Sequence, residues 1–175
     1  PGKEFTRILS LLRKICGNDR VKWVEQSNIH ITLAFLGDTE ADRIGDINAM
    51  LDIRCGGSGS FDLVLKGLGV FKNLNDPRII WAGIESPEKL TLLHGAIKSG
   101  LNDCGIKIEE RSFKPHLTLG RIKELKNTDL IKKFIEDFRE NVIQKVTVNE
   151  VIIYESILLP SGPVYKHIGK VSLQQ

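Results

Sequence analysis

The pattern of apolar positions predicts a helix near the start of the chain. Four apolar residues recur at the i, i+3, i+4, i+7 spacing that places side chains on one face of a helix: Ile8, Leu11, Leu12 and Ile15. This spacing predicts a helix over residues 4–16, and Gly17 with Asn18 is a plausible stop. Weaker signals of the same kind predict three more helices, over residues 39–53, 87–104 and 128–140.

Shorter β-prone segments alternate with these helices. They predict strands over residues 21–25, 29–36, 61–70, 78–85, 106–108, 116–119, within 142–159 and over 164–173. Helices and strands follow one another without a regular βαβ rhythm. The chain therefore has the pattern of an α+β fold with mainly antiparallel sheet.

Length and composition place the chain among ordinary globular proteins. Its 175 residues suffice for one domain or for two small lobes that share a core, and 41% of them are hydrophobic. No apolar run approaches the ~18 residues of a transmembrane helix, and the first residues do not look like a signal peptide. A net charge of +3 favours a negatively charged substrate over a positive one.

Several chemistries find no support in the sequence. The three cysteines are an odd number without a C-x-x-C pair, which argues against a disulfide framework or a thiolate zinc site and indicates a cytosolic compartment. The glycine patterns of dinucleotide-binding and P-loop proteins do not occur.

An internal repeat is the most informative feature. The segment that begins at His30 reads H-I-T-L, and it recurs as H-L-T-L from His116, about half the chain length later. From average residue usage, two of four histidines would have this context by chance with a probability on the order of 10⁻⁴. The repeat suggests two related lobes that face one another.

The spacing within each motif has chemical sense. Side chains alternate across a strand, so His30 and Thr32 share one face while Ile31 and Leu33 anchor the other face in the core. Two such segments would bring two imidazoles and two hydroxyls to one place. One neutral and one protonated imidazole can act as general base and general acid, and the hydroxyls can donate hydrogen bonds to phosphate oxygens. No metal is then required.

Other segments resemble a known family in the same order along the chain. They are VKWV at 21–24, NIHITLAFLG at 28–37, RIIWAG at 78–83, FKPHLTLGR at 113–121, ES at 155–156 and GPVY at 162–165. Together they resemble the 2H phosphoesterase superfamily, defined by two H-x-[ST]-h motifs in which h is hydrophobic. Within it, the likeness is to the RNA 2′,3′-cyclic phosphodiesterases, historically called 2′-5′ RNA ligases. Family members usually begin with a short strand before the first helix, and the printed chain starts at that helix.

The resemblance carries implications for fold and activity. It implies a single two-lobed domain over residues 1–175, with two mainly antiparallel sheets lining a central cleft and helices outside. It implies hydrolysis of RNA 2′,3′-cyclic phosphate ends to 2′-phosphomonoesters, with a reversible 2′-5′ ligation activity. We expect a cytoplasmic monomer that binds RNA or oligonucleotide ends, needs no cofactor or metal and does not bind membranes.

The predicted site consists of the two motifs and two basic residues. We assign His116 as the base that activates water and His30 as the acid that protonates the leaving ribose oxygen, although the symmetry of the motifs leaves the order open. Thr32 and Thr118 would orient the phosphate and stabilise its developing charge.

The basic residues, Arg121 and Lys114, are predicted to contact phosphate or RNA. Arg121 matches the family pattern H-x-T-L-x-R, but in a regular strand its side chain would face away from His116. A bulge at Gly120 would turn it toward the site. Lys114 shares strand parity with His116, which allows it to reach the same place.

Two other functions stay open at this point. The first is a 2H enzyme that acts on a small cyclic nucleotide or a 2′-5′ oligonucleotide. The second is an RNA-end-binding module without catalysis, although a pure binder has no need of two titrating imidazoles. His94 and His167 lack the H-x-T context, and we interpret them as structural.

Overall fold

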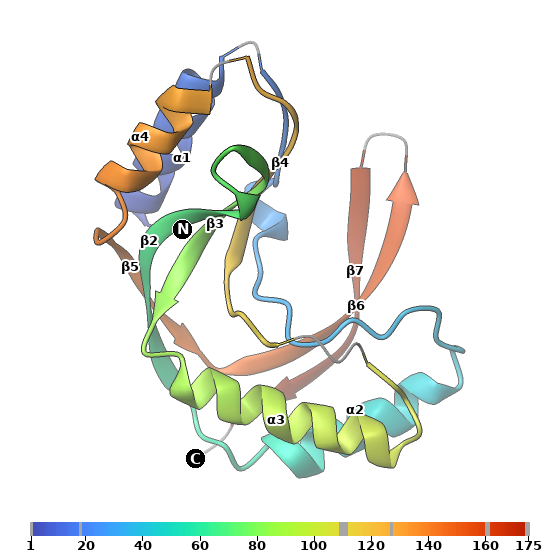
Figure 1. The fold of residues 1–175 in the computed structure, drawn as a ribbon. Coiled ribbons are helices and arrows are strands. Elements are labelled where there is room, and N and C mark those ends of the chain that lie inside the picture. The colour runs from blue at the N-terminus through green and yellow to red at the C-terminus, as the bar shows by residue number, and fades with distance from the viewer. Residues whose placement is uncertain (1, 18, 109–111, 127, 160–161, 174–175) are drawn as a thin grey trace. The chain divides into compact units, whose positions relative to one another are not determined.

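The computed structural model describes residues 2–17, 19–108, 112–126, 128–159 and 162–173. Within these ranges the chain forms four α-helices, one 3₁₀ helix and seven strands (Figure 1). In chain order they are α1 (Lys3–Cys16), β1 (Arg20–Trp23), η1 (Gln26–Asn28), α2 (Arg43–Cys55), β2 (Phe61–Asn73), β3 (Asp76–Glu85), α3 (Glu88–Asp103), β4 (Leu117–Glu124), α4 (Thr128–Asp137), β5 (Val142–Val148), β6 (Glu150–Leu159) and β7 (Gly162–Ser172).

These elements fall into two compact units, and both H-x-T pairs belong to the first. This unit comprises Pro1–Thr32, Leu63–Ser86 and Pro115–Val146. Its five-stranded sheet has the order β1-β4-β3-β2-β5, and the pairs β1–β4, β4–β3 and β3–β2 are antiparallel.

One face of this sheet carries the hydrophobic core of the first unit. Helices α1 and α4 lie side by side (Figure 1), and their apolar stripes pack with inward side chains of the strands in one buried cluster. Members of the cluster include Ile8, Leu12, Ile80, Leu117, Leu119, Ile131 and Phe134. We call the opposite surface of the sheet the open face.

The second unit has its own sheet and helices. It comprises Leu33–Asp62, Pro87–Lys114 and Thr147–Gln175, and its sheet is the antiparallel hairpin of β6 and β7. Helix α2 packs against α3 and β7. Gly100 allows a close approach of α2 to α3, because a Cβ there would lie 2.2 Å from the sulfur of Met50. Both sheets are mainly antiparallel, which confirms the predicted α+β class.

Most predicted elements are confirmed, and two predicted strands are wrong. All four helices form close to the predicted positions, although α2 begins four residues later than predicted. Residues 106–108 form no strand, and residues 29–36 contribute only an isolated bridge at Ile31. The second failure has a physical reason: beyond Thr32 the chain passes into the second unit and leaves the strand that it would have paired with. Across the described residues, no helix is both long and apolar enough to cross a membrane.

Gly67 in β2 is a position where the first unit requires glycine. Its φ of +73° lies in the left-handed region, and a Cβ there would lie 2.4 Å from the carbonyl oxygen of Arg139. We expect Gly67→Ala to lower the free energy of unfolding by about 2 kcal/mol or more, because the new methyl group meets rigid backbone in a strained conformation. Urea denaturation measures this change.

Gly95→Ala is the matched control for this prediction. Gly95 is an exposed residue inside α3, and nothing lies within 4 Å of a Cβ placed there. Alanine at this position should stabilise the protein by up to about 1 kcal/mol through helix propensity. Equal effects of the two substitutions would show that Gly67 is not conformationally required.

Candidate active site on the open face

A single backbone bridge joins the two motifs. Ile31 pairs with Leu117 in an antiparallel bridge, and both side chains pack in the core of the first unit. The residues on either side of each therefore point to the open face. Antiparallel pairing places His30 across from Thr118 and Thr32 across from His116. All four motif side chains thus share one face of one sheet.

The bridge also relates the two motifs by a local two-fold axis. Ile31 and Leu117 are the second residues of their respective motifs, so the axis passes between them. It exchanges His30 with His116 and Thr32 with Thr118. The histidines occupy diagonal positions across the pair, where Cα atoms are about 7–8 Å apart. Two imidazoles at this separation can contact one phosphate placed between them.

His30 is oriented by a backbone hydrogen bond. Its Nδ1 lies 2.8 Å from the carbonyl oxygen of Asn28, the last residue of η1. A carbonyl oxygen can only accept a hydrogen bond, so Nδ1 carries the proton and donates it. The nitrogen that exchanges protons with a substrate is therefore Nε2. The short 3₁₀ helix, which the sequence did not predict, supplies this carbonyl.

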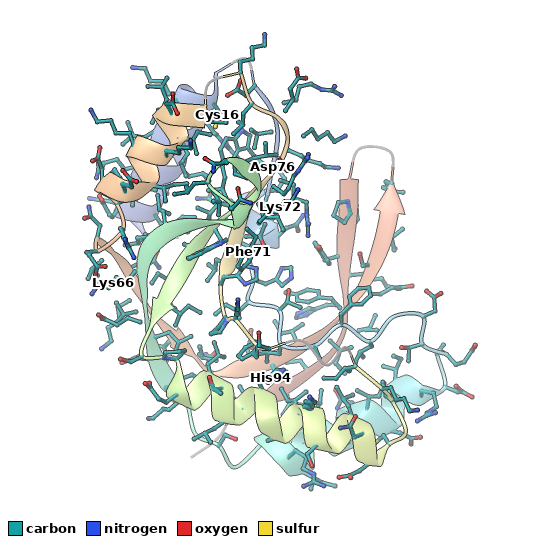
Figure 2. All side chains as sticks on the ribbon, viewed as in Figure 1. Cys16, Lys66, Phe71, Lys72, Asp76 and His94 are labelled. Atoms are coloured by element: carbon teal, nitrogen blue, oxygen red, sulfur yellow. The ribbon has the colours of Figure 1, made fainter. Side chains whose placement is uncertain are left out.

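His116 packs against an aromatic ring from β2. The ring centroids of His116 and Phe71 are 4.7 Å apart and the rings are nearly perpendicular, at 89°. Phe71, labelled in Figure 2, in turn has its ring centroid 5.4 Å from that of Trp81. The Trp81 ring covers Gly69, where a Cβ would lie 2.2 Å from an indole carbon. These contacts limit rotation of the His116 ring.

Sequence reasoning missed Phe71 as a neighbour of the site. The sequence did indicate the face on which Phe71 lies. Side chains alternate along β2, and Phe71 is two residues from Gly69, so both residues are on the same face. What the sequence did not contain was the pairing register that places this face beside the motifs.

A bulge in β4 brings Arg121 to the open face. The antiparallel register pairs three residues of β3 with three of β4: Ile79 with Arg121, Ile80 with Gly120 and Trp81 with Thr118. Leu119 is thus the extra residue of a bulge. Because Ile79 and Trp81 are two residues apart, their partners Arg121 and Thr118 lie on the same face. The expectation that a bulge near Gly120 redirects Arg121 is confirmed.

Lys114 differs from the other predicted site residues. Its side chain is exposed and belongs to the second unit, whereas His30, Thr32, His116 and Thr118 belong to the first. A contact between Lys114 and substrate stays a prediction.

The other two histidines have structural surroundings. His94 stacks on Phe113 with ring centroids 4.0 Å apart and an interplanar angle of 1°. Burial, and secondarily the charge of Lys98, hold the pKa of His94 below its ordinary value. His167 lies 5.0 Å from the ring of Tyr154. These contacts fit the structural roles expected from the sequence.

The two buried cysteines, Cys16 and Cys55, do not offer an alternative nucleophile. Burial, with a smaller contribution from the charge of Asp19, raises the pKa of Cys16 to about 11. Burial also raises the pKa of Cys55. Both side chains are therefore neutral thiols near pH 7, and a thiol is a poor nucleophile. In the part of the chain that the structure describes, no three His, Cys, Asp or Glu side chains gather as a metal site.

Comparisons with known proteins identify relatives over most of the chain. A family model described as the 2′-5′ RNA ligase superfamily matches residues 7–157. A Thermotoga maritima protein named RNA 2′,3′-cyclic phosphodiesterase is 39% identical over 144 residues, which are 82% of this chain and 75% of that protein. An Archaeoglobus fulgidus protein of the same name is 32% identical over 166 residues, covering 93% of this chain and 89% of the relative.

Solved structures share the fold. A crystal structure of a Thermus thermophilus protein superimposes with a TM-score of 0.79 at 26% sequence identity. The match covers 99% of this chain and 94% of the other. The antiparallel sheets and helices described above are thus the arrangement of a known structural group.

The hydrogen bond of His30 makes a spectroscopic prediction. In the free protein, the neutral His30 ring should carry its proton on Nδ1, the less common tautomer of histidine in water. Two-bond ¹⁵N–¹H correlation spectra of the ring distinguish the two tautomers, and His30→Gln identifies the signal. A ring protonated on Nε2 when neutral would contradict the hydrogen bond to Asn28.

Proposed function

Because this chain belongs to the 2′-5′ RNA ligase superfamily, we propose that it hydrolyses RNA 2′,3′-cyclic phosphate ends to 2′-phosphomonoesters, with His30 and His116 as its acid–base pair. The names of its relatives support the reaction. The observation that carries the residue assignment is the Ile31–Leu117 bridge, which places both histidines and both threonines on one face.

The reaction needs one proton removed and one supplied. His116 accepts a proton from water as the water oxygen attacks phosphorus. The bond between phosphorus and the ribose O3′ breaks, and Nε2 of His30 donates a proton to O3′. The product carries a phosphate on O2′ and a free 3′-hydroxyl. The hydrogen bond from Nδ1 of His30 to Asn28 leaves Nε2 as the nitrogen that exchanges this proton.

The local two-fold axis suits a displacement in which the attacking and leaving oxygens lie on opposite sides of phosphorus. Each imidazole exchanges a proton with one of these two oxygens. The roles exchange when the reaction runs backward, as microscopic reversibility requires. Ligation through a 2′-5′ linkage uses the same proton transfers, with the 5′-hydroxyl of a second RNA in place of water.

Thr32 and Thr118 bind the phosphate oxygens that do not react. Each lies across from the histidine of the other motif, so each hydroxyl is directed to the same phosphate as both imidazoles. Hydrogen bonds to a charged phosphate strengthen as negative charge grows in the transition state. Arg121, on the same face, adds a positive charge to the substrate-binding surface beside the motifs.

The cellular setting follows from the same features. The protein acts on RNA ends in the cytoplasm as a monomer. The three free cysteines, Cys16, Cys55 and Cys104, support a reducing compartment. All four motif residues come from one copy of the chain, so the site needs no second subunit.

Replacement of either histidine tests the proposal most directly. We expect His30→Ala and His116→Ala each to lower kcat by about 10²-fold or more, because each removes one half of the acid–base pair. The double variant should be little worse than either single one, since the pair acts as a unit. Steady-state hydrolysis of a cyclic-phosphate dinucleotide, with the position of the product phosphate assigned by NMR, measures both points.

His94→Ala and His167→Ala are the matched controls and should keep nearly full turnover. The wild-type pH profile should be bell-shaped, because one imidazole must be neutral while the other is charged. Full activity of the His30 and His116 variants would reject the catalytic assignment. Binding of the dinucleotide without turnover by the wild type would instead favour the RNA-end-binding module.

The donor set makes a separate prediction about metals. Histidine and threonine without a carboxylate form a poor set of ligands for a divalent cation, since threonine is seldom a ligand for zinc or magnesium. Turnover should therefore survive exhaustive dialysis against EDTA. Activity that is lost on dialysis and restored only by an added divalent metal would require another mechanism.

A further inference from the structure

We infer that Lys22 and Arg121 form a second phosphate subsite, which binds the 5′-phosphate of the nucleotide whose cyclic phosphate is hydrolysed. This inference rests on the proposed function and adds a substrate preference to it: a 5′-phosphorylated or internal nucleotide over a free nucleoside cyclic phosphate.

The register places Lys22 directly across from Arg121. Lys22 in β1 is the antiparallel partner of Arg121 in β4, and Arg121 is the partner of Ile79 in β3. Residues directly opposite in an antiparallel pair share a face and have Cβ atoms about 5 Å apart. Lys22 and Arg121 therefore stand together on the open face, and both side chains are exposed.

The Lys22–Arg121 pair lies close to the motifs, displaced from Thr118 by two residues along the neighbouring strand β3. Arg121 is opposite Ile79, and Thr118 is opposite Trp81, two residues further along β3. Two residues of a strand span roughly 6.6–6.8 Å. One nucleotide of an RNA chain separates its two phosphates by a similar length. A phosphate held by the motifs thus leaves the 5′-phosphate of the same nucleotide within reach of Lys22 and Arg121.

The charges of the pair favour an anion between them. Two like charges directly opposite on neighbouring strands repel each other and destabilise a sheet. Some other cations of the first unit are paired with carboxylates: Asp76 pairs with both Lys72 and Arg78, and Glu85 pairs with Lys66. Among the described residues, no carboxylate lies within ion-pair distance of Lys22 or Arg121, and a phosphate would supply the missing negative charge.

Two small substrates test the subsite. One is a nucleoside 2′,3′-cyclic phosphate with a 5′-hydroxyl, and the other is the same compound with a 5′-phosphate. We expect the wild type to have a kcat/KM about tenfold higher for the phosphorylated compound, the value of one charge-assisted contact. Lys22→Gln should remove most of this ratio, and the double variant with Arg121→Gln should bring it close to one. Added salt should lower the wild-type ratio, because the contact is exposed to solvent.

Lys133→Gln is the matched control. Lys133 is an exposed lysine of α4, the helix that packs on the other face of the sheet, and its removal changes net charge by the same amount. In this variant the ratio of kcat/KM between the 5′-phosphorylated and the 5′-hydroxyl compound should stay at the wild-type value. A ratio of one in the wild type, or a raised ratio that Lys22→Gln leaves intact, would overturn the subsite while the proposed function stands. Failure of the wild type to hydrolyse either compound would overturn the subsite, whereas failure to hydrolyse the cyclic-phosphate dinucleotide would overturn the proposed function as well.

Discussion

One backbone bridge, between Ile31 and Leu117, determines the geometry of the candidate site. The bridge residues are apolar and pack in the core, so they hold the two motif segments in place by burial as well as by pairing. Since side chains alternate along an extended chain, packing of these two residues in the core places the histidines and threonines on the opposite face. The residue between His and Thr is therefore structural, although it lies inside the chemical motif.

The segment that precedes His30 supplies the backbone acceptor that orients the His30 ring. The pairing of β1 with β4 continues to Val24, whose N–H donates to the carbonyl oxygen of Leu119. The chain then leaves the sheet as η1 and returns at Ile31, where it pairs with Leu117. This detour supplies the Asn28 carbonyl that orients His30.

The sequence supplied candidate site residues but not the neighbours that surround them. Apolar spacing located the helices, and the repeated motif identified the two histidines without structural information. Strand parity showed that Arg121 could join them only through a bulge, which the register contains at Leu119. Phe71 and Lys22 depend on which strands are neighbours and in what register. Sequence periodicity carries neither kind of information, so these two residues emerged only from the structure.

The bulge at Leu119 also changes how β4 can vary in length. Before it, the even-numbered residue Thr118 faces the open side and Leu117 the core; after it, the odd-numbered Arg121 faces the open side and Ile122 the core. Deletion of Leu119, the extra residue of the bulge, would turn this segment into a regular strand and would keep Thr118 and Arg121 on the open face. Deletion of one residue elsewhere in β4 would instead exchange the two sides for the residues that follow it. The bulge is therefore the place in β4 where the gene can lose one codon without exchanging the two faces of the strand.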